Sequence, residues 1–275
     1  MDSLEKVVEN IKSVKIQGAK EIALYALKFL RNFCKKNGFK LKFEVATMIL
    51  ERSRPTAVVL HNCIEILMKK RSLKTIDDLI KRLETSAERI SRNGRDLIKN
   101  NYTIMTHCHS GEAMTVIKRA WKDGKKVSVI ATLTKPLDQG IRTVKELAQE
   151  KIPVTLIIDN AVGYFMKDVD IVLVGTDAIR LAPPYGIVNK IGTLNLALAA
   201  KKYKKPFYVV GNTLKVDKRK KIVIEERPSS EVYKNLKGVK IRNPAFDIIA
   251  FNLIEYIITE KGIFTPSRFQ KIFSS

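Results

Sequence analysis

The first hundred residues carry hydrophobic positions at helical spacing. Apolar side chains recur three and four residues apart, and the pattern stops at Gly38 and again before Pro55. Thr75 stands where an N-cap residue would open a long amphipathic helix. The spacing predicts helices over residues 3–14, 20–38, 42–54, 55–71 and 75–100. The sequence therefore predicts an all-α N-terminal helical domain, which we assign to residues 1–100.

From residue 101 the pattern changes to short apolar runs that alternate with helical stretches. The runs are rich in β-branched residues and too apolar to have a solvated face, which predicts strands over residues 102–108, 127–133, 154–160, 170–177 and 206–212. Helices are predicted over residues 111–126, 140–151, 160–168, 192–205 and, at the end, 244–262. This alternation predicts a Rossmann-like α/β domain with a mostly parallel sheet and a C-terminal helix, over residues 101–275.

The residues that follow each predicted strand form the candidate site. In a parallel sheet ligands bind beyond the carboxyl ends of the strands. Polar, small or reactive residues stand at five such ends: 106–111, 134–140, 159–160, 175–177 and 211–215. Together they predict a small-molecule site. Asp, Asn and Ser also cap helices, so for Ser110, Asp159 and Asn160 the capping interpretation stays open.

Cys108 and Asp177 are the residues at these strand ends that could transfer protons. Cys108 precedes a predicted helix start, whose dipole would lower the pKa of the thiol and make it a base or nucleophile. Asp177 follows a very apolar strand, and desolvation there would raise the pKa of its carboxyl group. The alternatives are a buried small hydrophobe for Cys108 and a helix cap for Asp177. Core packing is the interpretation we favour for Cys34 and Cys63.

The sequence predicts neither a metal site nor a cofactor. His107 and His109 would need a third ligand from elsewhere, and the three cysteines are too widely spaced for a zinc knuckle or a disulfide framework. The phosphate-binding patterns GxGxxG and GxxxxGK[ST] are absent from the sequence. Residues 189–193 place a lysine, a glycine and a hydroxyl before a predicted helix, a pattern that suits a phosphate group.

The charge of the chain is strongly basic and unevenly placed. Lys and Arg number 51 against 28 Asp and Glu, a formal net charge of +23. Residues 1–100 carry 22 basic and 12 acidic side chains, residues 101–200 carry 12 and 9, and residues 201–275 carry 17 and 7. Such a balance suits an acidic partner, or a Lys-rich solvated surface. The basic clusters 201–205 and 215–221 leave nonspecific nucleic-acid contact open, but no motif supports sequence-specific readout.

The sequence gives no sign of a membrane protein. Its apolar runs are all shorter than the roughly 18–20 residues that span a bilayer, and its N-terminus has no signal-peptide core. We therefore expect a soluble, cytoplasmic protein that does not engage a membrane.

Nine motifs, in a fixed order along nearly the whole chain, resemble one known family. They are IQGAKEIA, RSRPTAVVL, THCHSG, TKPLDQG, IIDNAVGYFM, VLVGTDAI, GIVNKIGT, PFYVVGNTLK and NPAFDII. The family is that of the translation initiation factor 2B alpha, beta and delta subunits, which also contains 5-methylthioribose-1-phosphate isomerase and archaeal ribose-1,5-bisphosphate isomerase. The resemblance implies an N-terminal helical domain and a Rossmann-like domain that dimerises, so we expect a homodimer or higher assembly through the C-terminal domain.

The resemblance also implies roles for individual residues. In the isomerases of this family a cysteine and an aspartate carry out the aldose–ketose proton transfers, and the matching positions are Cys108 and Asp177. The positions that match the family's sugar-phosphate ligands are Gln17, Gly18, Ala19, Arg54, Gln139, Asn189, Lys190 and Lys215. Ser110 and Gly111, at the predicted helix start after Cys108, complete the candidate binding residues.

Three departures separate this chain from the isomerases. Gln17 stands where the enzymes have arginine, which removes a bidentate, charged phosphate contact. Lys135 replaces another usual arginine, and residues 180–185 are longer than the corresponding turn and carry two prolines. Conversely, the regulatory alpha subunits usually lack the Cys and Asp pair that this chain keeps.

Two functional hypotheses follow from the resemblance. The first is an archaeal alpha-subunit-like protein that binds or regulates translation initiation factor 2, supports guanine-nucleotide exchange and holds a sugar-phosphate or nucleotide pocket. The alternative is an isomerase of a phosphorylated ribose, an intramolecular oxidoreductase in which Cys108 accepts a proton and Asp177 donates one. At this stage we favour the first.

Overall fold

The computed structural model describes residues 3–13, 15–16, 18–234 and 236–274. The contacts divide the chain into two compact units. The helical unit comprises Met1–Ser86 with Leu214–Val216, and the sheet unit comprises Ala87–Thr213 with Asp217–Ser275. The domain boundary that we assign after residue 100 stays a prediction.

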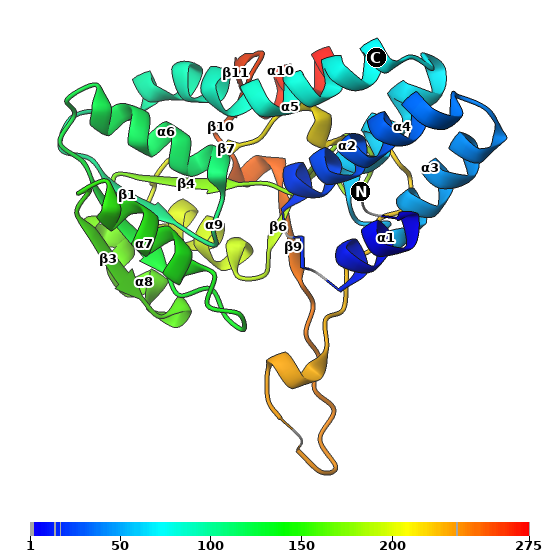
Figure 1. The fold of residues 1–275 in the computed structure, drawn as a ribbon. Coiled ribbons are helices and arrows are strands. Elements are labelled where there is room, and N and C mark those ends of the chain that lie inside the picture. Colours follow the sequence, from blue (N-terminus) through cyan, green and yellow to red (C-terminus); the bar gives the residue numbers. More distant parts are fainter. Residues whose placement is uncertain (1–2, 14, 17, 235, 275) are drawn as a thin grey trace. The chain divides into compact units, whose positions relative to one another are not determined.

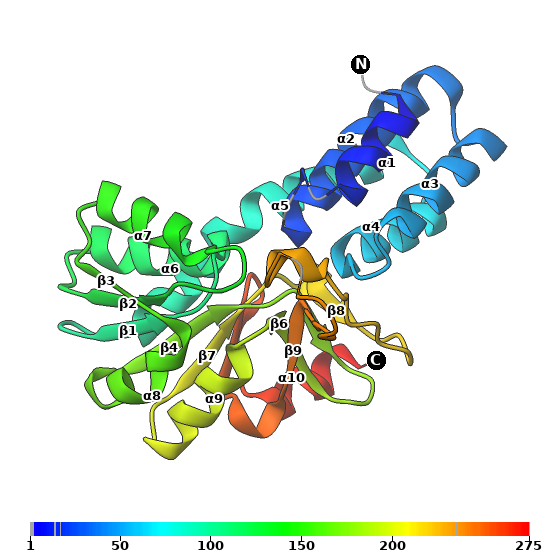
Figure 2. The ribbon, with the colours of Figure 1, turned by 90° about the horizontal axis from the view of Figure 1, so that it is seen from below.

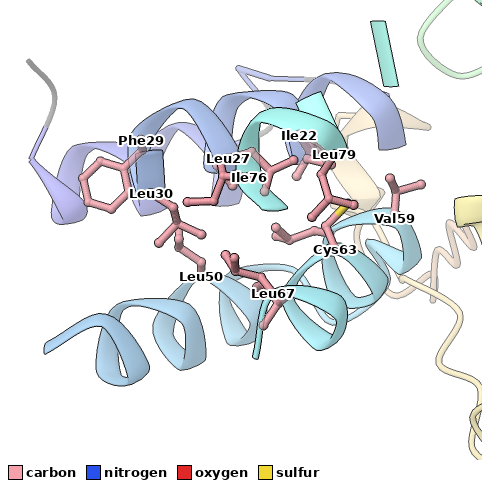
Figure 3. Packing of buried hydrophobic residues seen from close by; sticks show 14 of the residues in the cluster. Ile22, Leu27, Phe29, Leu30, Leu50, Val59, Cys63, Leu67, Ile76 and Leu79 are labelled. Carbon is pink, nitrogen blue, oxygen red and sulfur yellow. The ribbon is translucent and has the colours of Figure 1, made fainter. Parts of the chain in front are cut away.

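The helical unit is a bundle of amphipathic helices. Its helices are α1 (Leu4–Lys12), α2 (Ala19–Asn37), α3 (Leu41–Ser53), α4 (Val58–Lys69) and the first part of α5 (Leu73–Gly94). Their apolar faces meet in one core, in which Leu27 of α2 lies beside Ile76 of α5 and Leu30 of α2 points toward Leu50 of α3 (Figure 3). Such an all-helical arrangement is what the three-and-four spacing predicts.

Two helix starts differ from the prediction. The fourth helix begins at Val58 rather than at Pro55, because residues 54–57 form a turn in which the amide of Ala57 donates to the carbonyl oxygen of Arg54. The long helix α5 is capped by Ser72, whose hydroxyl accepts the amide of Thr75 at 3.0 Å, so Thr75 lies inside the helix. It ends at Gly94 and continues as a 3₁₀ turn over Arg95–Leu97.

The two cysteines of the helical unit are core residues. Cys34 and Cys63 are buried on α2 and α4 among the aliphatic side chains of the bundle. Burial raises the pKa of the Cys34 thiol to about 11 and that of Cys63 to about 12. Both thiols therefore behave as small apolar groups.

The sheet unit is built on a seven-stranded sheet in the order β11-β10-β7-β4-β1-β2-β3. Six strands run parallel and β11 pairs antiparallel with β10. Their bounds are β1 Thr103–Thr106, β2 Ser128–Thr132, β3 Val154–Ile157, β4 Ile171–Gly175, β7 Phe207–Val210, β10 Tyr256–Thr259 and β11 Gly262–Phe264. The prediction of a Rossmann-like, mostly parallel sheet is thereby confirmed.

Helices cover both faces of this sheet. In Figure 2 the helices α6 (Gly111–Lys122) and α7 (Gly140–Gln149) lie on one face, and α8 (Val162–Phe165) and α9 (Thr193–Lys202) lie on the other. Buried strands such as β4, whose residues are all buried, need this two-sided cover. The crossovers bring the carboxyl ends of β1, β2 and β4 to one edge of the sheet.

A second sheet was not foreseen from the sequence. It has the order β8-β5-β6-β9, with bounds β8 Val216–Asp217, β5 Ala178–Arg180, β6 Gly186–Lys190 and β9 Phe246–Ala250. The pairs β5–β6 and β6–β9 are antiparallel. Residues 180–185, which are longer than the corresponding turn of the isomerases, contain the end of β5 and the turn into β6.

The prediction of a helix over residues 244–262 is wrong. This segment forms β9, a 3₁₀ turn (Phe251–Leu253) and β10, and Figure 1 shows it as extended chain in orange to red. Short apolar runs such as Ile248-Ile249 and Ile257-Ile258 have no periodicity that separates a buried strand from a helix. The C-terminal helix is instead α10 (Pro266–Phe273), capped by Thr265.

Within the described part of the chain, no helix is both long enough and apolar enough to cross a membrane.

Candidate active site

The candidate site lies at the edge where β1, β2 and β4 end. Cys108 follows β1, Gln139 ends the segment after β2, and Asp177 follows β4. Because β1 pairs with both β2 and β4, Cys108 stands between the other two. The Cys108 thiol donates to Oε1 of Gln139 at 3.4 Å, and the charges of Lys190 and Asp177 both act on it. Strand order thus brings Cys108, Gln139 and Asp177 to one edge of the sheet, and Lys190, at the end of β6, acts on the thiol from the second sheet.

The thiol of Cys108 is not activated in the way that the sequence suggests. Removal from water raises its pKa to about 11, with Asp177 raising it further and Lys190 lowering it. The predicted helix dipole does not lower the pKa of the thiol enough to offset burial, because α6 begins at Gly111 and its N-cap is Ser110, two residues beyond the cysteine. The dipole acts mainly on groups at the first turn. The ligand-free protein therefore holds Cys108 as a neutral thiol at neutral pH.

The backbone of Cys108 adopts a left-handed conformation with φ of +64°. Its amide donates to Thr134 Oγ1 at 2.8 Å, and its carbonyl oxygen accepts from Thr143 Oγ1 at 2.9 Å. For a residue with a Cβ, this conformation costs roughly 1–2 kcal/mol of free energy. Two hydrogen bonds of about 1 kcal/mol each are of the size to offset that cost.

Asp159 positions the segment that carries Gln139. Its two carboxylate oxygens accept the amides of Thr134 and Lys135, each at 2.7 Å. Asp159 itself opens the short 3₁₀ turn Asp159–Ala161 after β3. Its side chain therefore fixes the neighbouring loop, an arrangement that neither the capping nor the ligand interpretation anticipated.

Asn189 and Lys190 end β6, and both lie next to the start of α9. Asn189 donates to Thr193 Oγ1 at 3.1 Å, and the Lys190 ammonium lies 5.3 Å from the centre of the Phe246 ring. The amides of Gly192 and Leu194 donate to one carboxylate oxygen of Asp247, at 2.7 and 3.0 Å. The predicted phosphate position at this helix start is thus occupied by the chain's own carboxylate, while Lys190 supplies a cation beside it.

The histidines beside Cys108 belong to two different networks. His107 is buried; its Nε2 donates to the carbonyl oxygen of Ile191 at 2.8 Å, so Nδ1 accepts from Thr132 Oγ1 at 2.7 Å. Burial lowers the pKa of His107, which keeps it neutral. Its ring packs on Gly192, where a Cβ would lie 2.9 Å from it. Sequence reasoning missed this link between the end of β1 and the segment after β6.

His109 points elsewhere, to Thr143 Oγ1 at 3.2 Å and to Glu146 at 3.5 Å. Among the described residues, no group of three or more His, Cys, Asp or Glu side chains is arranged to hold a metal ion.

Ser110 and Gly111 begin α6. The Ser110 hydroxyl accepts the amide of Ala113 at 3.3 Å, so the capping interpretation holds for this residue. Ser110 also packs against Gly175 at the end of β4, where a Cβ would lie 2.4 Å from the hydroxyl oxygen. Gly175 thus allows the start of α6 to approach β4 closely.

The remaining predicted binding residues belong to the helical unit. Gly18, with φ of +91°, is the N-cap of α2, Ala19 is its first residue, and Arg54 follows the end of α3. Lys215 is buried in a 3₁₀ turn, and the carbonyl oxygens of Leu214 and Val216 beside it both accept from Asn62 at 2.7 Å. Gln17 lies outside the described residues.

A family model described as the initiation factor 2 subunit family matches residues 15–266. The chain belongs to this family. Two relatives called ribose 1,5-bisphosphate isomerase are similar to it: that of Archaeoglobus fulgidus is 41% identical over 97% of this chain and 91% of the relative, and that of Methanocaldococcus jannaschii is 39% identical over 97% and 92%. A methylthioribose-1-phosphate isomerase of Acetivibrio thermocellus is 37% identical over 95% of the chain and 88% of the relative.

Two solved structures have the same fold as this chain. A translation initiation factor eIF-2B of Pyrococcus horikoshii matches 97% of this chain and 98% of its own, with a TM-score of 0.86 and 25% identity. A 5-methylthioribose 1-phosphate isomerase from the same organism matches 99% of this chain and 88% of its own, with a TM-score of 0.77 and 27% identity. The fold is therefore common to a protein with an initiation-factor name and to a protein with an isomerase name.

Proposed function

We propose that this chain is an aldose–ketose isomerase that acts on a phosphorylated ribose. The observation that carries the proposal is the pairing of Cys108 and Asp177 at the ends of neighbouring strands, where the charge of Asp177 acts on the thiol. The isomerase names of relatives that are 37–41% identical over nearly the whole chain support it. It reverses the preference that we draw from the sequence, in which the initiation-factor hypothesis came first.

The reaction needs one group that accepts a proton and one that donates a proton. A base removes the proton from carbon 2 of the sugar, and the electron pair of that bond forms a double bond between carbons 1 and 2 as the bond from carbon 1 to the ring oxygen breaks. An acid protonates the ring oxygen, which becomes the hydroxyl of carbon 4. The hydroxyl on carbon 2 then gives its proton back to that acid group and becomes the ketone, while the base returns the first proton to carbon 1. Atoms and electrons balance within the substrate. Two side chains on opposite sides of the reacting carbons suffice for this chemistry.

Cys108 as acceptor and Asp177 as donor form a coupled pair. In the ligand-free protein the proton is on Cys108, whose pKa is about 11. Because the Asp177 charge raises that pKa and Lys190 lowers it, protonation of Asp177 favours the thiolate. The state with an ionised Cys108 and a protonated Asp177 is the one from which the reaction starts.

We assign the remaining candidate residues to binding of the anionic groups of the substrate. Lys190 supplies a cation that acts on the Cys108 thiol, and Asn189 precedes it at the end of β6. Ser110 and Gly111 follow β1, and Gln139 follows β2. By resemblance to the family, Gly18, Ala19, Arg54 and Lys215 of the helical unit, with Gln17, bind phosphate. Ribose 1,5-bisphosphate is the first choice of substrate, because the relatives that are 41% and 39% identical over 97% of the chain carry that name.

A protein of the initiation-factor kind is the second candidate. The observation that favours it is the similarity to the Pyrococcus horikoshii initiation factor, whose TM-score is 0.86. Under this hypothesis the chain binds translation initiation factor 2. Assembly as a homodimer through the sheet unit, and a place in the cytoplasm, are expected under both hypotheses and remain proposals. Nonspecific contact with nucleic acid has no further support.

The experiment offers ribose 1,5-bisphosphate and methylthioribose 1-phosphate separately, with and without a nucleotide, and follows the ketose product by NMR. Cys108→Ser and Asp177→Asn are run beside the unaltered protein. Turnover that both substitutions reduce by a factor of at least ~10² supports the proposal. If neither sugar phosphate is converted, the isomerase hypothesis fails, and co-purification with translation initiation factor 2 then tests the second candidate.

A further inference from the structure

Two buried threonine hydroxyls hold both polar backbone groups of Cys108. Thr134, in the segment after β2, accepts the amide of Cys108, and Thr143, on α7, donates to its carbonyl oxygen. Both threonines are fully buried, at 0% exposure, whereas Cys108 itself is partly exposed. The cysteine backbone is thus fixed by the segment after β2 and by α7 rather than by its own strand.

Each hydroxyl is oriented by a further partner. Thr134 Oγ1 accepts from Cys108 and donates to the carbonyl oxygen of Thr132 at 3.3 Å. The single hydroxyl hydrogen of Thr143 goes to the carbonyl oxygen of Cys108, and His109 Nδ1 lies 3.2 Å from the same hydroxyl oxygen. Asp159 fixes the amide of Thr134 in turn. The two hydroxyls are therefore pre-oriented before any substrate arrives.

The contacts have a direct consequence for the thiol. A residue with a Cβ leaves the left-handed conformation readily unless its surroundings impose it. In this conformation the Cys108 sulfur lies 3.4 Å from Gln139 Oε1, in the site edge that also feels Asp177 and Lys190. Removal of either hydroxyl would let the backbone relax and carry the sulfur away from these groups.

We propose that Thr134 and Thr143 are positioning residues, a hydroxyl clamp that sets the place of the Cys108 thiol for proton transfer. The catalytic part of this inference rests on the proposed isomerase function. The structural part concerns the reactivity of one thiol and does not depend on any substrate. The competing explanation is that the two hydroxyls only satisfy buried backbone groups, as most buried polar groups in proteins are satisfied.

The test replaces each threonine by valine, which keeps the shape and removes the hydroxyl, and by serine, which keeps the hydroxyl. The variants are Thr143→Val, Thr143→Ser, Thr134→Val and Thr134→Ser. Thr85→Val is the matched control, because the Thr85 hydroxyl donates only to a backbone carbonyl of its own helix, that of Lys81. Two quantities are measured: the steady-state constants kcat and KM, and the rate of alkylation of each cysteine by iodoacetamide between pH 7 and 10.5, read by peptide mass spectrometry.

The clamp predicts opposite changes in the two quantities. Valine at either position lowers kcat by a factor of about 10 to 100 and changes KM by less than about threefold, as expected when a reacting group is misplaced by a fraction of an ångström. At the same time Cys108 alkylates faster at pH 8, because a thiol released from this site moves from a pKa of about 11 toward its ordinary value of about 8.5. The serine variants and Thr85→Val keep the values of the unaltered protein.

Other outcomes overturn the proposal. If the valine variants alkylate Cys108 with the unaltered rate and midpoint, the hydroxyls do not position the thiol. If Cys34 and Cys63 become labelled together with Cys108, the threonines serve the fold as a whole, and the clamp is refuted. A protein that turns over no sugar phosphate refutes the proposed function alone, since the alkylation profiles still decide whether the clamp exists.

Discussion

At the scale of single residues, the chemistry of the site depends on how burial and neighbouring charges shift the pKa of the Cys108 thiol. Cys108 shares a pKa of about 11 with the core residue Cys34, yet only Cys108 has a carboxylate and an ammonium group acting on it. Its position at a strand end could be predicted from the alternation of apolar runs. The direction of its pKa shift could not, because that depends on where α6 begins and on which groups surround the sulfur.

The raised pKa predicts the pH dependence of the isomerase. The reacting form has Cys108 ionised and Asp177 protonated. Between the pKa values of the two groups its share of the free enzyme does not change with pH, because a higher pH favours the thiolate and disfavours the protonated carboxyl group to the same extent. We therefore expect kcat/KM to stay flat from pH 6 to 9, below the Cys108 pKa of about 11. Stopped-time assays in overlapping buffers measure this profile. A kcat/KM that rises about tenfold per pH unit over that range would contradict the assignment of Asp177 as the proton donor.

At the scale of elements, the second sheet is held by a buried ion pair. Arg180 of β5 is fully buried and donates to Asp217 at 3.0 Å and to the carbonyl oxygens of Arg219 and Pro183. Burial raises the pKa of Asp217, but hydrogen bonds from Arg219 and Arg180 outweigh it and lower the pKa overall. Arg180, which the sequence placed in a loop, thus joins β5 to the chain that follows β8.

Removal of the Asp217 charge should destabilise the sheet unit. Asp217→Asn leaves Arg180 buried without its counter-charge, which costs about 3–5 kcal/mol of the free energy of unfolding. Urea unfolding followed by the fluorescence of Trp121, the single tryptophan, reports on this unit. Glu88→Gln, which removes an exposed partner of Arg92, is the control and should leave the midpoint unchanged. An Asp217→Asn midpoint equal to that of the control would refute a structural role for the pair.

The Asp217 carboxylate also determines the pH range over which this ion pair stabilises the folded protein. Because the pKa of Asp217 is lowered in the folded state, its contribution is complete above the unfolded value of about 3.9 and is lost as the pH falls through the lower folded value. The Asp217→Asn variant should therefore show a smaller loss of stability below pH 4 than the unaltered protein.

The errors at the element scale have one physical origin. The strands β1 to β4 could be predicted because helices of clear periodicity separate them. Residues 244–262 could not, because strand pairing between β9 and β6 and between β10 and β7 decides their conformation, and those partners are distant in sequence. Strand β6 itself carries Asn189 and Lys190, so the second sheet is also what orients two candidate binding residues.

At the scale of the whole molecule, the net charge of +23 bears on how an anionic substrate arrives. Most of the excess lies in residues 1–100 and 201–275, so the field acts at long range rather than through contacts at Cys108. The assignment of each candidate residue to one of the two compact units also belongs to this scale. Sequence motifs alone could not show that Lys215 is grouped with the helical unit while its neighbour Thr213 is grouped with the sheet unit.

Salt should therefore slow the capture of substrate. We expect kcat/KM for a bisphosphate to fall about tenfold between roughly 0.02 and 0.5 M ionic strength, because the screening length shrinks below about 10 Å above 0.1 M. The turnover number kcat serves as the internal control and should stay within about twofold. A parallel loss of kcat would point to unfolding or inhibition by the salt and contradict electrostatic capture.

The most direct test of the central claim is the turnover of ribose 1,5-bisphosphate by matched cysteine variants. The unaltered protein and Cys34→Ser should form the ketose, since Cys34 is a core residue of the helical unit. Cys108→Ser should lower kcat by a factor of about 10² to 10⁴, the usual effect of losing a general base. Equal turnover by Cys108→Ser and Cys34→Ser would contradict the assignment of Cys108, and absence of turnover in the unaltered protein, with either sugar phosphate, would contradict the isomerase itself.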